Sequence, residues 1–162
     1  MRTLPFLLLA FAACAASSAE IRTAKTATYK VNDGGPLFAL AEQAAADKHY
    51  KVGAADEGHL TYETEPKWYS PEGDLQTAGA DNYTLINGHS VKVSFVVTVT
   101  QTEATEFVIS VLPHTWQYIG GSPQLRPLEP NDPNLPPWVL GRADALSVAI
   151  YDRAKGFAVG SN

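Results

Sequence analysis

Alternating apolar residues between positions 91 and 116 constrain the fold of this chain more than any other feature. Apolar side chains recur at every second position, first at Val91, Val93, Phe95, Val97 and Val99 and then, after a polar break at 102–105, at Phe107, Ile109 and Val111. A period of two is typical of a strand with one buried face, and a short break between two such strands predicts a β-hairpin. The hairpin needs a partner layer that covers its apolar face.

Two segments that flank this hairpin have helical spacing instead. After Pro36 the apolar and small positions are Leu37, Leu40, Ala41, Ala44 and Ala45, and after Pro137 they are Val139, Ala143, Leu146 and Ile150. Spacing by three and four predicts amphipathic helices, and proline is well tolerated in a first helical turn. Further strands are expected at 27–31 and 59–65. The order β-α-β-β-β-α predicts an α+β two-layer sandwich, an antiparallel sheet of three to four strands with two helices on one face.

The first nineteen residues have the pattern of a secretory signal peptide. Arg2 supplies a positive start, residues 4–13 are apolar, and Ser17, Ser18 and Ala19 offer the small residues that precede a cleavage site. The apolar run is too short for a stable membrane-spanning helix. We therefore expect cleavage after Ala19 and a periplasmic or secreted protein.

Cys14 supports a second interpretation of the same segment. Ala12, Ala13 and Cys14 look like the end of a bacterial lipobox, in which the cysteine is acylated. Lipidation would make the protein an outer-membrane lipoprotein, and only in that case would we expect a membrane partner. Cleavage after Ala19 would instead leave no cysteine and hence no disulfide.

The remaining residues, 20–162, are expected to form a single α+β domain. The formal charge of the whole chain is -5, and removal of Arg2 makes it -6. Because no basic patch is present, nucleic acid is not an expected partner. Proline and glycine interrupt two segments, 66–90 and 120–137, which are predicted to be long loops.

The sheet face without helices is the predicted binding surface. Strand parity places Val96, Leu112, His114 and Trp116 on that face, and Trp68 and Tyr69 of the 66–90 loop are further candidates. A mixed apolar and polar face of this kind suits an envelope protein or a glycan as partner. An alternative is that one long loop folds back and covers the face.

Catalytic and metal-binding motifs give weaker indications. A metal site at His59, Glu63 and His114 lacks the spacing of known zinc motifs, so we predict no metal and no cofactor. No nucleophile elbow surrounds a serine. We therefore predict a non-enzymatic secreted or periplasmic binding or accessory domain. The alternatives are a small hydrolase or carbohydrate-active enzyme that uses His114 with Glu63 or Glu65, and a lipid-anchored structural lipoprotein.

One stretch resembles a known group of domains. Its residues are Tyr50, Val52, Asp56, Gly58, Leu60, Tyr62, Thr64 and Trp68. This pattern resembles small bacterial envelope domains of the BamC type, which are built as a helix, a three-strand meander and a helix. The resemblance covers residues 37–151 as architecture and implies a non-enzymatic role in the cell envelope, often as an assembly or accessory component. The two long loops depart from the compact pattern of that group.

Overall fold

A computed structural model describes residues 16–76, 89–120 and 122–160, and within them the chain is a mixed α+β structure with three α-helices and an eight-stranded antiparallel sheet. The elements are α1 (Ser18–Thr26), β1 (Thr28–Lys30), α2 (Gly35–Asp47), β2 (Val52–Asp56), β3 (Thr61–Thr64), β4 (Lys67–Tyr69), β5 (Leu75–Gln76), β6 (Val91–Glu103), β7 (Glu106–Tyr118), β8 (Leu125–Pro127), α3 (Pro137–Ala154) and a short 3₁₀ helix (Lys155–Phe157).

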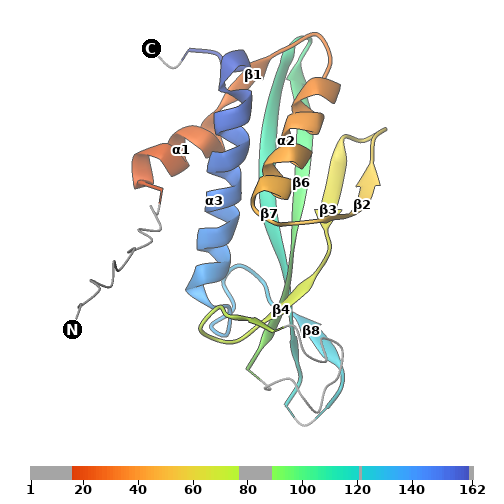
Figure 1. Cartoon of the computed structure of the whole chain (residues 1–162), viewed down its shortest axis with the longest axis vertical. Coiled ribbons are helices and arrows are strands. Elements are labelled where there is room, and N and C mark those ends of the chain that lie inside the picture. The colour runs from red at the N-terminus through yellow and green to blue at the C-terminus, as the bar shows by residue number, and fades with distance from the viewer. Residues whose placement is uncertain (1–15, 77–88, 121, 161–162) are drawn as a thin grey trace, which may run out of the picture.

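The predicted hairpin is confirmed as β6 and β7, which run the length of the molecule (Figure 1). The two strands pair from Val91 opposite Gln117 to Glu103 opposite Glu106, so that only Ala104 and Thr105 form the turn. All other strands attach to this hairpin or to each other. The main path of the sheet is β1-β7-β6-β3-β2, while β4 pairs with β6, β5 with β4, and β8 with β7.

The helices lie on one side of the sheet, as expected (Figure 1). Phe95 is 1% exposed and belongs to one apolar cluster with residues of α2 and α3 such as Leu37 and Leu146. The Tyr62 hydroxyl donates a hydrogen bond to the Ala41 carbonyl oxygen, 2.8 Å away, which joins β3 to α2. Burial of these apolar side chains is the main stabilising contribution to the fold.

The sheet has more strands than the three to four that periodicity predicted. The additional elements are α1, β2, β4, β5 and β8. The four strands among them have two to five residues each. A run this short carries too few alternations to be recognised from the sequence. It forms because a neighbouring strand supplies hydrogen-bond partners: β6 for β4, β7 for β8, β3 for β2 and β4 for β5.

The chain around the predicted cleavage site includes a helix. Ser17 is the N-cap of α1, and its side chain and that of Glu20 form a capping box. Ser18 and Ala19, which were assigned to the signal peptide, lie in the first turn. Cys14 and the rest of the predicted apolar segment lie outside the described residues. Within the described chain, no helix has the length and apolar character needed to cross a membrane.

Candidate functional site

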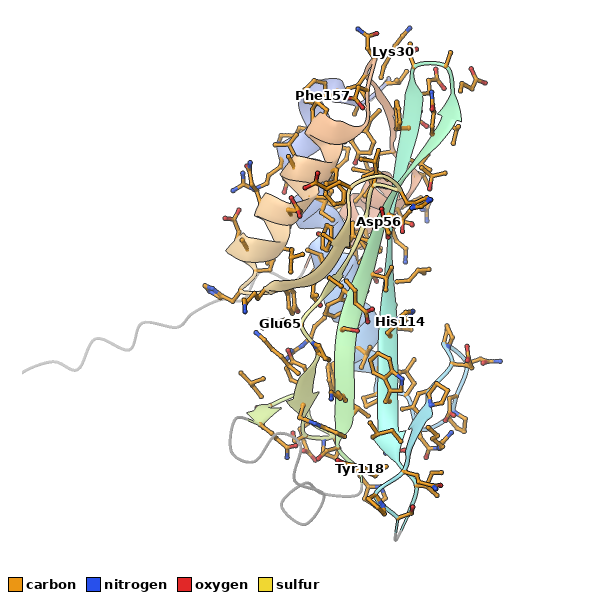
Figure 2. All side chains as sticks on the ribbon, turned by 90° about the vertical axis from the view of Figure 1, so that its right-hand side faces the viewer. Lys30, Asp56, Glu65, His114, Tyr118 and Phe157 are labelled. Atoms are coloured by element: carbon orange, nitrogen blue, oxygen red, sulfur yellow. The ribbon has the colours of Figure 1, made fainter. Side chains whose placement is uncertain are left out.

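The face of β6 and β7 that is turned away from the helices presents cross-strand pairs of side chains. Strand register places Leu112 opposite Val96, His114 opposite Ser94, and Trp116 opposite Lys92. Leu112 is 60% exposed, which is unusual for a leucine in the centre of a sheet. We call this surface the outer face. Figure 2 shows His114 about midway along the hairpin, with the helices on the other side of the sheet.

Glu63 on β3 connects the two long strands across this face. The Ser94 hydroxyl donates a hydrogen bond to Glu63 Oε1 at 2.5 Å, and His114 Nδ1 lies 3.2 Å from the same oxygen. Ser94 is fully buried, whereas the His114 side chain is 51% exposed. Among the described residues, the second oxygen of Glu63, Oε2, accepts no hydrogen bond. The carboxylate is therefore held in place and still has one oxygen available.

Two hollows adjoin each other at His114. The first, about 420 Å³, is lined mainly by apolar groups, with Leu112 and Trp116 on β7 and Pro127, Leu128, Glu129 and Pro130 on the segment that follows. The second, about 320 Å³, lies between β7 and the β2–β3 hairpin and is lined by Asp56, Glu63, Val96 and His114 among others. His114 lines both hollows, and we call the two together the outer groove.

The 120–137 segment supplies one wall of this groove. Its strand β8 pairs with the end of β7, with Trp116 opposite Pro127. Leu128 is 5% exposed and donates its backbone N–H to the Thr115 carbonyl oxygen, which fixes the wall to β7. Arg126 and Asp132 form an ion pair at 2.7 Å within the segment. The described part of this loop therefore borders the outer face and leaves Leu112 exposed.

Sequence reasoning missed this wall. The prolines indicated a loop, and Pro127 lies in strand β8 while Pro130 begins a turn, but nothing in the local pattern specified which side of the sheet the segment would border. The contact depends on Leu128, an apolar residue between two prolines, and this residue was the one signal of a buried anchor.

Trp68 and Tyr69, predicted as binding residues of a loop, lie in strand β4 and are buried. Trp68 is 1% exposed on the outer face and stacks on Tyr118 with ring centroids 5.0 Å apart. Tyr69 lies on the opposite face, packs against Trp138, and has the Arg142 guanidinium 4.3 Å from its ring centroid. Alternation along a strand sends neighbouring side chains to opposite faces, so the two residues cannot share one surface. Residues 77–88 of that predicted loop lie outside the described residues.

The other candidate residues separate in the structure. His59 Nδ1 contacts Asp56 at 2.7 Å in the β2–β3 turn, and Glu65 pairs with Lys51 at 2.6 Å. Only Glu63 and His114 of the predicted metal or catalytic set come together. Within the described residues, no three histidine, cysteine or acidic side chains are placed to hold a metal ion.

The charge of the outer groove is acidic. Asp56, Glu63 and Glu129 line it, and none of its lining residues in the described chain is lysine or arginine. The hydrogen bond with the His59 side chain, reinforced by the His59 backbone N–H, lowers the pKa of Asp56. Asp56 is therefore ionised across the neutral range and contributes negative charge at one end of the groove.

Comparison with known proteins adds no family to this description. A search of protein-family models and a search of curated proteins each returned no match to the chain. Fold and site together describe an α+β sandwich in which helices bury one face of the sheet and an acidic, partly apolar groove crosses the other.

Proposed function

We propose that this chain is a non-enzymatic binding or accessory domain, secreted or periplasmic, that engages another component of the cell envelope through its outer face. The observation that carries this proposal is the exposure of Leu112 beside the outer groove. A single exposed leucine is common on protein surfaces, but Leu112 lines one hollow together with Trp116, Pro127 and Pro130. A contiguous apolar hollow with a few polar groups is typical of an interaction surface. The resemblance to BamC-type envelope domains points in the same direction.

The arrangement of Ser94, Glu63 and His114 supports a binding role over hydrolysis. In a serine hydrolase the imidazole lies between the hydroxyl and the carboxylate, so that it can accept the hydroxyl proton. Here Glu63 lies between Ser94 and His114, and the Ser94 hydroxyl donates to the carboxylate itself. Because Ser94 is fully buried, a substrate has no access to its oxygen. The cluster is better suited to holding Glu63 in position.

Localisation in this proposal depends on the N-terminal segment. An apolar run of ten residues after Arg2 directs export, and lipidation at Cys14 would add a membrane tether next to α1. The binding role of the outer face is the same in either case, because α1 lies on the helical side of the sheet (Figure 1).

Site-specific photo-crosslinking tests the binding role. Benzoylphenylalanine is placed at position 112 in the full chain and, as a matched control, at position 46, where Ala46 is exposed on α2. After irradiation of cells that export the protein, we expect an adduct of defined mass at position 112 and none at position 46. Absence of adducts at position 112, or equal adducts at both positions, would contradict the proposal.

A further inference from the structure

The outer groove has a shape and a charge that select one class of partner. We infer that it binds an extended polypeptide segment whose groove-facing side chains, at every second position, include both apolar and basic residues. This inference rests on the proposed function and specifies the partner of the same face. Three properties of the groove support it: its length, the nature of its lining, and its charge.

The length and direction of the groove favour an extended chain. Leu112, His114 and Trp116 occupy alternate positions of one strand, so their side chains form a row with a spacing of roughly 7 Å. An extended peptide has the same repeat, which lets every second side chain meet the row. The larger hollow follows this row along β7, and the smaller hollow lies on the other side of His114, toward Glu63 on β3.

The lining of the larger hollow favours apolar side chains. Leu112, Trp116, Pro127 and Pro130 border it, and Glu129 is its one acidic residue. Sugars require several side-chain donors and acceptors around each ring, and this hollow offers few of them. Aliphatic side chains would instead cover Leu112 and the Trp116 ring, removing apolar surface from water.

The charge of the rim favours basic residues in the same segment. The exposed Glu129 carboxylate has no ion-pair partner among the described residues, and Glu63 pairs with His114 through Oε1 alone. Within the described chain no lysine or arginine lines the groove, and Lys92 lies beside it, opposite Trp116. Glu63 is already held by Ser94 and His114, so little further ordering is required when a cation binds. An acidic segment would be repelled by three carboxylates.

Synthetic peptides test this inference directly. One peptide repeats Leu-Ser-Lys-Ser, so that leucine and lysine share one face of the extended chain. A second peptide has glutamate in place of the lysine, and a third has serine in place of the leucine. Binding to the full exported protein is followed by fluorescence anisotropy of a label on the peptide. We expect the leucine–lysine peptide to bind, and the other two to bind at least about tenfold more weakly, because each lacks one of the two complementary features.

Substitutions in the groove test whether the peptide binds there. Three substitutions in the groove should each weaken binding of the leucine–lysine peptide by about threefold to tenfold: Leu112→Ser, Glu63→Gln and Glu129→Gln. Glu129→Gln is included because Glu129 is exposed, so this substitution should leave the fold intact. The controls are Leu140→Ser on α3, where the leucine is 41% exposed, and Glu103→Gln at the hairpin tip. Both controls should bind like the unmodified protein.

Two results would overturn the inference: binding of the leucine–glutamate peptide as tightly as the leucine–lysine peptide, or no detectable binding of the leucine–lysine peptide. If crosslinks at position 112 persist in either case, the outer face binds a different ligand and only the partner class is wrong. If they are also absent, the proposed function fails together with the inference.

Discussion

Glu63 shows how one side chain organises the outer face. Its Oε1 atom accepts a hydrogen bond from the Ser94 hydroxyl. The two partners differ in exposure, because Ser94 is buried and Glu63 is not. Loss of the carboxylate leaves a buried donor unsatisfied, whereas loss of the hydroxyl leaves a carboxylate that water can reach, because the Glu63 side chain is 36% exposed.

The two deletions should therefore differ in cost. We expect Glu63→Leu to lower the free energy of unfolding by about 1–3 kcal/mol and Ser94→Ala by less than about 1 kcal/mol. Urea unfolding followed by circular dichroism measures both, and Glu63→Gln, which keeps an acceptor oxygen, is the control. A larger loss for Ser94→Ala than for Glu63→Leu would mean that the hydroxyl, and not the carboxylate, holds this junction.

Tyr29 on β1 makes stability sensitive to alkaline pH. Burial, with a smaller contribution from the neighbouring Tyr151, raises its pKa to about 12. An unfolded tyrosine ionises near pH 10, so between pH 10 and 12 the unfolded state loses a proton that the folded state keeps. The contribution of Tyr29 to the free energy of unfolding is therefore complete below pH 10 and is lost as the pH rises above 10.

The loss should approach about 3 kcal/mol by pH 12, at about 1.4 kcal/mol per pH unit. This loss is measured from the urea midpoints of the unmodified protein and of Tyr29→Phe at pH 9 and pH 11. The difference between the two proteins removes the contribution of other titrating groups. We expect the unmodified protein to lose more stability over this interval. Parallel losses in both proteins would show that Tyr29 ionises normally.

At the scale of elements, α1 depends on residues near the predicted cleavage site. Ser17 accepts a hydrogen bond from the Glu20 backbone N–H at 3.3 Å, while its own backbone N–H donates to the Glu20 carboxylate at 2.7 Å. The same helix is joined to α3 by the Lys25–Asp144 ion pair at 2.8 Å. Cleavage after Ala19 would remove the cap and place an ammonium group at the positive end of the helix dipole.

A chain that starts at Ala16 should thus be more stable than one that starts at Glu20, by about 0.5–2 kcal/mol. Urea unfolding compares the two chains, and Ser17→Ala in the longer chain isolates the contribution of the cap. Equal midpoints would mean that the cap and the first turn of α1 add nothing to the fold. Mass spectrometry of the exported protein distinguishes an N-terminus at Glu20 from an acylated Cys14.

The N-terminal turn of α3 is anchored by contacts between distant segments. Trp138 Nε1 donates to the Pro71 carbonyl oxygen at 2.8 Å, and Arg142 donates to the Gly73 carbonyl oxygen at 2.6 Å. Gly73 has a φ of +99°, and a Cβ there would lie 3.2 Å from the Trp138 ring. A glycine is therefore required where this loop meets the helix.

At the scale of the whole molecule, the sheet offers a face for binding and protects its edges. Edge strand β2 is five residues long and carries a bulge between Val52 and Ala54. In β7, the part between its pairings with β1 and β8 contains Pro113, which cannot donate a ladder hydrogen bond. Short, bulged or proline-containing edges discourage pairing with other chains. The proposed partner would therefore meet the outer groove and not an edge of the sheet.

The long periodic segments could be read directly from the sequence, because a buried face imposes its period on the residues that form it. The alternation through Phe95 predicted β6 and its inner face, and the spacing through Leu146 predicted the buried side of α3; both are confirmed. Parity alone also placed Leu112 and His114 on the outer face. These assignments depend only on contacts repeated along one element.

Tertiary structure alone decided which distant residues meet. Glu63 and His114 were two candidates among several, and folding brought them together while His59 and Glu65 found other partners. The groove wall at Pro127 and the strand that buries Tyr69 likewise depend on pairing with β7 and β6, which no local period records. The sequence by itself determined the layers of this protein, because burial repeats along each element. The outer groove was decided by single contacts between segments far apart in the chain, and these leave no periodic signal.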